Sequence, residues 1–367
     1  MRSGGSTVRR RPRPTRTFVS LTGPAGNLGD ALIRRGTLDW ALGTSEVLVA
    51  YVGTAPDVWL RQLGVPTGTR ILRGKRSVAR WLWMLATAPG RPVLVFEAGE
   101  VPLDRGNGLR ELVFLAETLL VRLKRGVVVR PPRAVRAPTQ PSLWLHSTAA
   151  RASQFALWRD VTSRATTGGT QLAPDIGFAA GQRPGLPSNE RDELIVSLRG
   201  KRPLPGPQWA EALNAFAAAH ELRIRTVVQV REDEERAREL ATMLSGEFDP
   251  WGERDAVAQE ALVRERYDRA RLVISDRLHV LILAALSGAV PSEVVADPTR
   301  KIADSFATIG LTGVSADAAS LSPGEITAFL TRQITRADDV RAAVTRAEAR
   351  LAETEADIRS AIEAARA

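Results

Sequence analysis

Short apolar runs alternate with amphipathic stretches along most of this chain of 367 residues, and this alternation restricts its fold more than any other feature. The apolar runs have the length of strands, and the stretches between them have the length of helices. Such a pattern is typical of parallel strands joined by crossover helices. It occurs twice, on either side of a Gly- and Pro-rich stretch at 177–189. The sequence therefore predicts two consecutive α/β domains joined by one hinge, which is the layout of a cleft enzyme.

The composition of each segment sets the expected boundaries. We expect a disordered basic arm at 1–16, an N-terminal α/β domain at 17–180, a linker at 181–190, a C-terminal α/β domain at 191–335, and a helix at 336–367. The predicted strands are 17–22, 46–52, 92–96, 126–129, 193–198, 224–230, 271–274 and 293–295. The predicted helices are 30–42, 78–86, 109–124, 208–220, 232–244, 255–270, 276–287 and 337–367.

The last of these helices has one apolar face. Its apolar residues recur every three or four positions, at Val340, Val344, Ala347, Leu351, Ile358 and Ile362. This face either packs back across the cleft or forms a dimer seam, so the sequence leaves homo-oligomerisation open.

The chain contains no cysteine and only three histidines, His146, His220 and His279. Disulfides and thiolate metal sites are therefore excluded, and the histidines are too dispersed to suggest a metal cluster. We expect neither a metal nor an organic cofactor. Since no signal-peptide or membrane-spanning run is evident, we expect a cytoplasmic protein.

The formal net charge of +10 comes mainly from arginine, because all but four of the 51 basic residues are arginines. No nucleic-acid motif or interleaved aromatic stripe accompanies them, so we do not expect nucleic acid as a partner. Several arginines cluster in the arm at 1–16. That arm is a candidate for holding the protein peripherally at an anionic membrane surface, on the inner face of the membrane.

The strongest chemical signal is the segment Ser275-Asp276-Arg277-Leu278-His279, between a predicted buried strand and a predicted helix. Ser275 or Asp276 is placed to cap the helix, and Arg277 and His279 fall in its first turn. A helix N-terminus at the carboxyl end of a strand is suited to an anionic ligand. The alternative is that Arg277 forms a surface ion pair and His279 is a half-buried structural residue.

Two more cations follow strands of the same predicted domain. Arg199 comes after the strand at 193–198, and Lys301 comes shortly after the strand at 293–295. Together with Arg277 they would make a rim of three cations around a small polyanion. The alternative for Arg199 and for Lys301 is a solvated surface cation.

A Gly-rich turn at 22–30 connects the first predicted strand to the first predicted helix. It lacks the lysine and the spacing of a nucleotide-binding fingerprint. Asn27, Gly29 and Asp30 could lie across the cleft from the cations, where the Asp30 carboxylate could accept a proton from a sugar hydroxyl. The alternative is a tight strand–helix turn in which Asp30 acts as a cap.

These segments resemble the polysaccharide pyruvyltransferase family. The likeness lies in the segment 26–33, in Arg159-Asp160-Val-Thr-Ser163 with Pro174-Asp175, in 275–279 followed by 285–291, and in Lys301-Ile302. It covers about residues 17–312. The chain departs from the family at Phe96-Glu97-Ala98-Gly99-Glu100, where members usually carry a Gly-rich run, and this departure bears on the acceptor side.

The resemblance implies a GT-B-like pair of Rossmann-type domains facing a cleft, with the acceptor side at 17–180 and the donor side at 191–335. It implies transfer of pyruvate from phosphoenolpyruvate, as co-substrate, onto a sugar of a polysaccharide or its lipid-linked precursor, as a cyclic ketal. The residues that it assigns to phosphoenolpyruvate are Arg199, Arg277, Leu278, His279 and Lys301. His279 would protonate the enol methylene, and Asp30 would act as a base or anchor the acceptor beside Asn27 and Gly29. Two alternatives stay open: a GT-B glycosyltransferase using a nucleotide sugar, and a non-catalytic anion- or glycan-binding protein of the same fold.

Overall fold

The computed structural model describes residues 15–183 and 185–366. Most of the expected arm, residues 1–14, lies outside the described residues. Arg16, which we assigned to the arm, instead begins the first strand.

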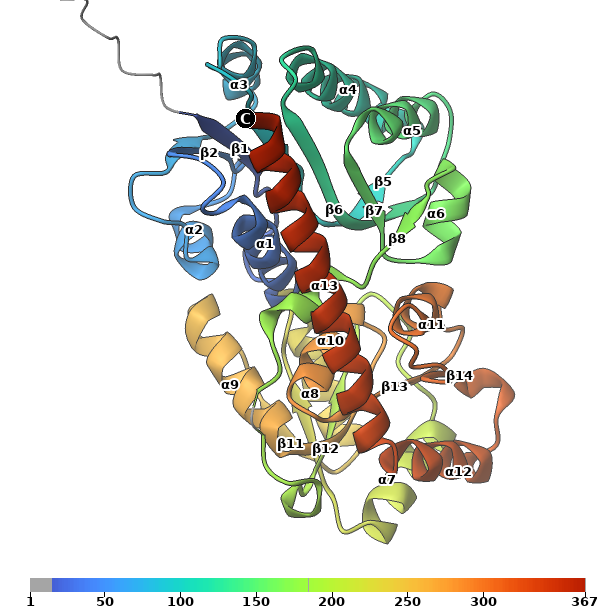
Figure 1. Cartoon of the computed structure of the whole chain (residues 1–367). Coiled ribbons are helices and arrows are strands. Elements are labelled where there is room, and N and C mark those ends of the chain that lie inside the picture. Colours follow the sequence, from blue (N-terminus) through green and yellow to red (C-terminus); the bar gives the residue numbers. More distant parts are fainter. Residues whose placement is uncertain (1–14, 184, 367) are drawn as a thin grey trace, which may run out of the picture.

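The first half of the chain forms a parallel sheet of eight strands. The strand order is β3-β2-β1-β4-β6-β7-β8, and β5 pairs with β6 (Figure 1). The strands are β1 (Arg16–Ser20), β2 (Val47–Tyr51), β3 (Arg70–Leu72), β4 (Val93–Val95), β5 (Gly99–Pro102), β6 (Val127–Arg136), β7 (Phe155–Trp158) and β8 (Gln171–Leu172). The α-helices between them are α1 (Leu28–Ala41), α2 (Asp57–Leu63), α3 (Ser77–Ala86), α4 (Gly108–Leu123), α5 (Ser142–Ala152) and α6 (Val161–Thr167).

The second half forms a parallel sheet of six strands in the order β11-β10-β9-β12-β13-β14. Its strands are β9 (Glu193–Ser197), β10 (Arg223–Val227), β11 (Glu247–Asp249), β12 (Ala270–Ser275), β13 (Val290–Val295) and β14 (Ser315–Asp317). Its α-helices are α7 (Pro207–Ala219), α8 (Glu234–Met243), α9 (Ala256–Arg269), α10 (Leu278–Leu286), α11 (Arg300–Ala307) and α12 (Pro323–Ile334). The final helix, α13, runs from Ala337 to Arg366. Two Rossmann-like domains with a long C-terminal helix are the predicted fold class, which is confirmed.

The two sheets share a hydrophobic core. One cluster of buried apolar residues extends from the first sheet through α1, α10 and α13 to the second sheet. The helix α10 lies at its centre, because its residues from Val280 to Leu286 are all almost fully buried. A separate cluster fills the other face of the first sheet, where Trp81 of α3 packs edge-on against Phe18 of β1.

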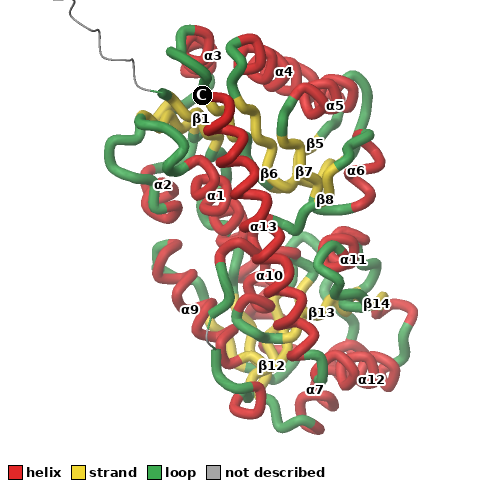
Figure 2. The backbone as a smooth tube through the Cα atoms, in the orientation of Figure 1, coloured by secondary structure: helices red, strands yellow, loops and turns green. Residues whose placement is uncertain are grey.

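Helix α13 crosses both halves of the molecule, as Figures 1 and 2 show. All six of its predicted apolar positions are buried. Toward the first half, Arg359 donates to the carbonyl of Leu42 at 3.2 Å, and toward the second half Arg346 donates to the carbonyl of Ile309 at 3.3 Å. The apolar face is thus used within the chain, as one of the two predicted arrangements requires.

Strand β6 is longer than predicted. We predicted that this strand ends at Val129, and the next residues include Pro131 and Pro132, which cannot donate to a sheet. The strand continues to Arg136 because its pairing with β7 shifts register between Arg130 and Arg133, which accommodates the prolines. Within residues 15–183 and 185–366, the structure contains no helix with the length and hydropathy needed to cross a bilayer.

Candidate active site

The segment 275–279 forms the turn between β12 and α10. Ser275 ends the strand, where its hydroxyl donates to the carbonyl of Ser197 at 2.5 Å and accepts from the backbone N–H of Arg277 at 3.0 Å. The N-cap residue of α10 is Arg277, and no side chain caps the helix. Our prediction that Ser275 or Asp276 caps α10 is therefore wrong. The Asp276 carboxylate instead accepts the backbone N–H of Arg199 at 3.0 Å.

His279, in the first turn of α10, contacts three residues from the first half of the chain. A Cβ atom added to Gly29 would lie 2.5 Å from the Cβ of His279, so the absence of a side chain at Gly29 lets α1 approach the imidazole. The Nε2 atom of His279 lies 3.5 Å from Nη1 of Arg159 and 3.6 Å from Oδ2 of Asp175. Sequence segments more than 100 residues apart thus meet at one imidazole.

Arg159 and Asp175 form a buried ion pair beside His279, with Nη1 and Oδ2 2.6 Å apart. Burial tends to raise the pKa of the Asp175 carboxyl, but the Arg159 guanidinium and His279 outweigh this effect and hold it far below its usual range. Asp175 is therefore a fixed negative charge that can orient the imidazole. Within the described part of the chain, Nε and Nη2 of Arg159 are buried without a hydrogen-bond partner.

Lys301 at the start of α11 reaches across to the first half of the chain. Its Nζ lies 2.6 Å from Oε2 of Glu100 in β5, and Arg159 Nη2 lies 3.9 Å from the same oxygen. Burial would raise the pKa of Glu100, but Lys301 and the neighbouring guanidiniums outweigh it and lower that pKa. Burial is also the main reason that the pKa of Lys301 is lowered, with repulsion from Arg159 adding to it. This contact lies at the same rim as His279.

The structure gives each predicted rim cation a carboxylate partner. The guanidinium of Arg277 binds Asp233 through Nε at 2.5 Å and Nη2 at 2.8 Å. Asp233 also accepts the backbone N–H of Gly200 at 2.9 Å, so the pair holds the loop after β9. Nε of Arg199 lies 3.7 Å from Asp276. The three cations therefore occur at one sheet edge, as predicted, but not as a rim of free charges.

A small cavity opens beside Arg199, at the carboxyl ends of β9, β12 and β13. Its volume is about 260 Å³, and it is lined by Leu198, Arg199, Arg202, Pro203, Leu204, Pro205, Gly206, Arg236, Asp276, Val295, Ala296 and Asp297. Arg236 shapes this cavity because it donates to the carbonyls of Arg202 at 2.8 Å and Gly200 at 3.3 Å. Burial raises the pKa of Asp276, and the arginines beside it only partly offset that rise. A protein of this architecture binds ligands at this edge of its sheet.

Asn27, Gly29 and Asp30 lie at the start of α1 and contact the second half of the chain. Asn27 caps the helix, since its Oδ1 accepts the backbone N–H groups of Gly29 and Asp30, and its Nδ2 donates to the Asp30 carboxylate at 2.7 Å. Asn27 also forms an antiparallel bridge with Val230, which follows β10. The observed role of Asp30 is thus to help order this turn, as in the alternative interpretation. A role for Asp30 as a base stays a prediction.

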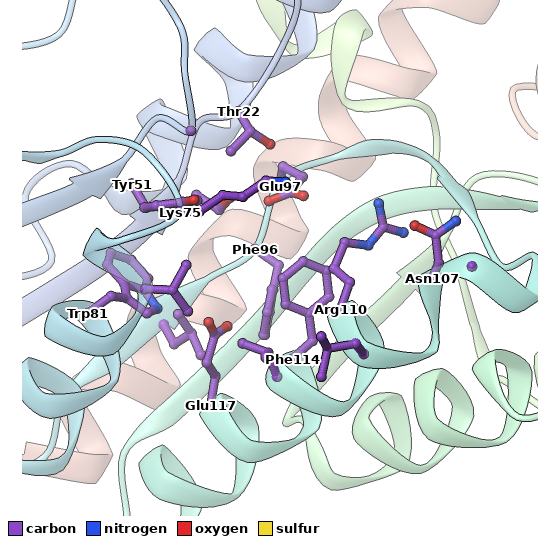
Figure 3. A pocket seen from close by; sticks show the side chains of 17 residues that line it. Thr22, Tyr51, Lys75, Trp81, Phe96, Glu97, Asn107, Arg110, Phe114 and Glu117 are labelled. Carbon is purple, nitrogen blue, oxygen red and sulfur yellow. The ribbon is translucent and has the colours of Figure 1, made fainter.

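A second and larger cavity lies in the first half of the molecule, at the carboxyl ends of β1, β2 and β4 and between α3 and α4 (Figure 3). Its volume is about 710 Å³, and His279 is not among its lining residues. Four aromatic side chains contribute to its wall, and four charged side chains reach it. These residues are Tyr51, Trp81, Phe96, Phe114, Lys75, Glu97, Arg110 and Glu117.

We call this larger cavity the aromatic pocket. Two of its carboxyl groups lie in unusual surroundings. Glu117 is almost fully buried, and burial with repulsion from Glu97 raises its pKa to about 8. Within residues 15–183 and 185–366, Oε2 of Glu97 is buried without a hydrogen-bond partner. Such groups are placed to bind the hydroxyl or amino groups of a ligand.

Sequence reasoning selected His279, Arg199, Arg277 and Lys301 but did not select Arg159, Asp175 or Glu100 as site residues. Arg159 and Asp175 belong to the segments that carry the family resemblance, so that signal was available. Glu100 lies in the segment 96–100, where the chain departs from the family. The structure uses this segment twice, because Phe96 and Glu97 line the aromatic pocket while Glu100 binds Lys301.

Comparison with known proteins shows similarity at the level of the fold. No protein-family model and no curated protein matches the sequence. A UDP-GlcNAc 2-epimerase from Neisseria meningitidis bound to UDP-GlcNAc has a TM-score of 0.54 and 10% identity, covering 94% of this chain and 99% of the epimerase. The glycotransferase of kitacinnamycin has a TM-score of 0.54 and 12% identity, over 97% of this chain and 100% of its own. The Anabaena protein HepE in complex with UDP has a TM-score of 0.52 and 12% identity, over 95% and 98%.

The chain has the GT-B fold. At these identities the likeness concerns the arrangement of the two Rossmann-like domains and does not extend to substrate.

Proposed function

We propose that this protein transfers the pyruvyl group of phosphoenolpyruvate onto two hydroxyls of a sugar, as a cyclic ketal. The observation that carries the proposal is the buried guanidinium of Arg159. It lies beside His279, and its Nε and Nη2 have no hydrogen-bond partner among the described residues. A buried guanidinium with spare donors is suited to a carboxylate or phosphate. Arg159 and His279 both belong to the segments that resemble the pyruvyltransferase family.

In this proposal His279 is the general acid. It would give a proton to the methylene carbon of phosphoenolpyruvate while a sugar hydroxyl adds to the neighbouring carbon and loses its own proton, for which Asp30 is the candidate base. A second hydroxyl would then displace phosphate, pass its proton to the departing phosphate and close the ketal. The Asp175 carboxylate would stabilise the imidazolium form of His279. Arg199, Arg277 and Lys301 would bind the donor's charges, with Leu278 beside them, and each cation would exchange or share its present carboxylate partner.

The aromatic pocket supports a sugar acceptor. Its rings offer apolar surfaces to the faces of a sugar, and Glu97, Glu117 and Arg110 offer hydrogen bonds to its hydroxyls. The segment 96–100 joins this pocket to the contact between Glu100 and Lys301. Binding of an acceptor in the pocket would therefore act on the contact between Glu100 and Lys301.

Phosphate release from phosphoenolpyruvate, with a panel of lipid-linked and polymeric sugars, tests the proposal. We expect His279→Gln to retain stabilisation by phosphoenolpyruvate in a thermal-shift assay and to lose about 10²–10⁴-fold in rate. In heavy water the wild type should place deuterium in the ketal methyl group. His220→Gln is the matched control, since His220 lies at the end of α7, outside the site, and should keep the wild-type rate. An unchanged rate for His279→Gln would show that the proton comes from another group.

A second candidate is transfer or epimerisation of a sugar carried by a nucleotide. It is favoured by the solved structures with this fold, two of which hold UDP or UDP-GlcNAc. Thermal stabilisation by UDP or UDP-GlcNAc, without stabilisation by phosphoenolpyruvate, would favour this candidate over pyruvyl transfer. Stabilisation by either ligand without turnover on any acceptor would favour a non-catalytic binding protein.

A further inference from the structure

Three helices at one end of the molecule expose large apolar side chains. Helices α3, α4 and α5 lie at the end farthest from the second sheet, and α4 packs against both of the others (Figure 1). Trp83 of α3 is 63% exposed, and Trp144 of α5 is 57% exposed. Most of the large hydrophobic residues that are exposed in this structure belong to these helices.

The apolar residues of α4 form a stripe. Leu109, Leu112, Ala116, Leu119 and Leu123 are separated by three, four, three and four positions, which places them along one side of a helix. Leu112, Leu119 and Leu123 are 51%, 45% and 82% exposed. The stripe is therefore turned away from the core, which α4 contacts through residues such as Val121 and Leu115.

The exposed charged side chains of these three helices are all basic. The only acidic residues of α3, α4 and α5 are Glu111 and Glu117, and both are buried. Each helix carries an exposed arginine: Arg80 on α3, Arg122 on α4 and Arg151 on α5. Arg76 and Arg125 are exposed just beyond the ends of α3 and α4.

We propose that the surface formed by α3, α4 and α5 docks on an anionic lipid bilayer. Exposed tryptophan and leucine between arginines are the features of a helix that lies in the membrane interface. The arginines would contact lipid phosphates while Trp83, Leu119 and Leu123 enter the region below them. A second copy of this chain fits less well, because pairing two such surfaces would oppose arginine to arginine without a carboxylate between them.

The aromatic pocket lies between α3 and α4, where Val78 and Trp81 face Val113 and Phe114. Docking of this surface would therefore bring a lipid-linked sugar to the mouth of the pocket. That consequence depends on the proposed function, whereas the docking does not.

Vesicle co-sedimentation of the full chain tests the docking. Vesicles of phosphatidylcholine with phosphatidylglycerol are compared with vesicles of phosphatidylcholine alone, at low and at high salt. We expect the wild type to bind the anionic vesicles and to bind less well at high salt. The double variants Leu119→Gln/Leu123→Gln and Arg80→Glu/Arg122→Glu should each weaken binding by about tenfold or more. None of these four residues lines either cavity, so phosphoenolpyruvate should stabilise the variants as it does the wild type.

Matched controls lie on the other half of the molecule. Val257 on α9 is 51% exposed and Arg332 on α12 is exposed, so Val257→Gln and Arg332→Glu should bind vesicles like the wild type. Circular dichroism establishes that every variant is folded. Equal sedimentation of wild type and both double variants would overturn the proposal, as would binding that deletion of residues 1–16 alone abolishes. Self-association that Leu119→Gln/Leu123→Gln removes, without vesicle binding by the wild type, would also overturn it in favour of a second copy.

Discussion

At the scale of single residues, Glu117 of the aromatic pocket has an unusual pKa for a carboxyl group. Burial, with repulsion from Glu97, raises its pKa to about 8, so the folded protein keeps a proton there at pH values where the unfolded chain has lost it. The proton is bound more tightly in the folded state. This group should therefore make the folded state less stable as the pH rises from about 4.5 to about 8.

Replacing Glu117 by Gln should remove this pH dependence. In that window the free energy of unfolding of the wild type should fall, relative to that of Glu117→Gln, by about 1.4 kcal/mol for each pH unit. Urea unfolding of both proteins at several pH values measures the difference. Glu353→Gln on the exposed side of α13 is the control and should follow the wild type. Parallel curves for wild type and Glu117→Gln would mean that Glu117 ionises normally in the folded protein.

Residues of the candidate site around His279 show which part of a site one sequence can predict. The sequence predicts the strand-to-helix turn at 275–279. It also predicts the three cations at this sheet edge, because each follows an apolar strand: Arg199, Arg277 and Lys301. Their partners were not found, because Asp233 and Glu100 lie 44 and 201 positions away from Arg277 and Lys301 in sequence. Local pattern contains no information on such pairs. The predicted cap of α10 was wrong for the same reason, because the Asp276 carboxylate accepts a hydrogen bond from the backbone N–H of Arg199.

At the scale of elements, α13 is the one whose sequence pattern is clearest. Each of its predicted apolar positions is buried, and it contacts both halves of the molecule. Leu351→Ala should lower the free energy of unfolding by about 2–5 kcal/mol, because a buried leucine is replaced by a cavity that the neighbours only partly fill. Glu353→Ala, on the exposed side of the same helix, should change it by about 0.5 kcal/mol or less.

Urea unfolding measures both variants. A similar loss for Leu351→Ala and Glu353→Ala would mean that α13 is not packed as the structure describes.

Several elements were predicted within a few residues of their ends, including α1, β9 and the short strand β4, whereas α12 was missed although it has twelve residues and begins with a capping box. Helix α1 has Asn27 as its N-cap, and strand β9 is an unbroken run of buried residues. Helices α5 and α6 were not predicted, since α5 begins after a proline and carries His146 and Ser147 on its buried side. Tertiary contacts determine whether such segments form helices. Nδ1 of His146 lies 2.7 Å from the Glu111 carboxylate of α4, and this hydrogen bond allows the polar face of α5 to be buried.

At the scale of the whole molecule, few polar contacts join α1 of the first half to α9 of the second. The main one is the bidentate pair between Arg35 and Glu260, at 2.9 and 2.5 Å. Burial tends to raise the pKa of Glu260, but Arg35 outweighs it and lowers that pKa. Domains of this size move relative to one another unless their interface holds them. The pair is placed to limit such movement, together with α13.

A double-mutant cycle measures how strongly this pair joins the two halves. Arg35→Ala, Glu260→Gln and the combined variant should give a coupling energy of about 1 kcal/mol or more, because the pair is bidentate and mostly removed from water. Arg264 binds the same carboxylate from within α9, at 2.8 Å. Its cycle with Glu260 is the control, and since it is an i,i+4 pair on one helix, its coupling should be about 0.3–0.5 kcal/mol. Because the pKa of Glu260 is lowered in the folded state, the coupling with Arg35 should be present at neutral pH and lost as the pH falls through that lowered value. Equal coupling energies in the two cycles, or a coupling with Arg35 that does not change in acid, would mean that this contact does not hold the halves together.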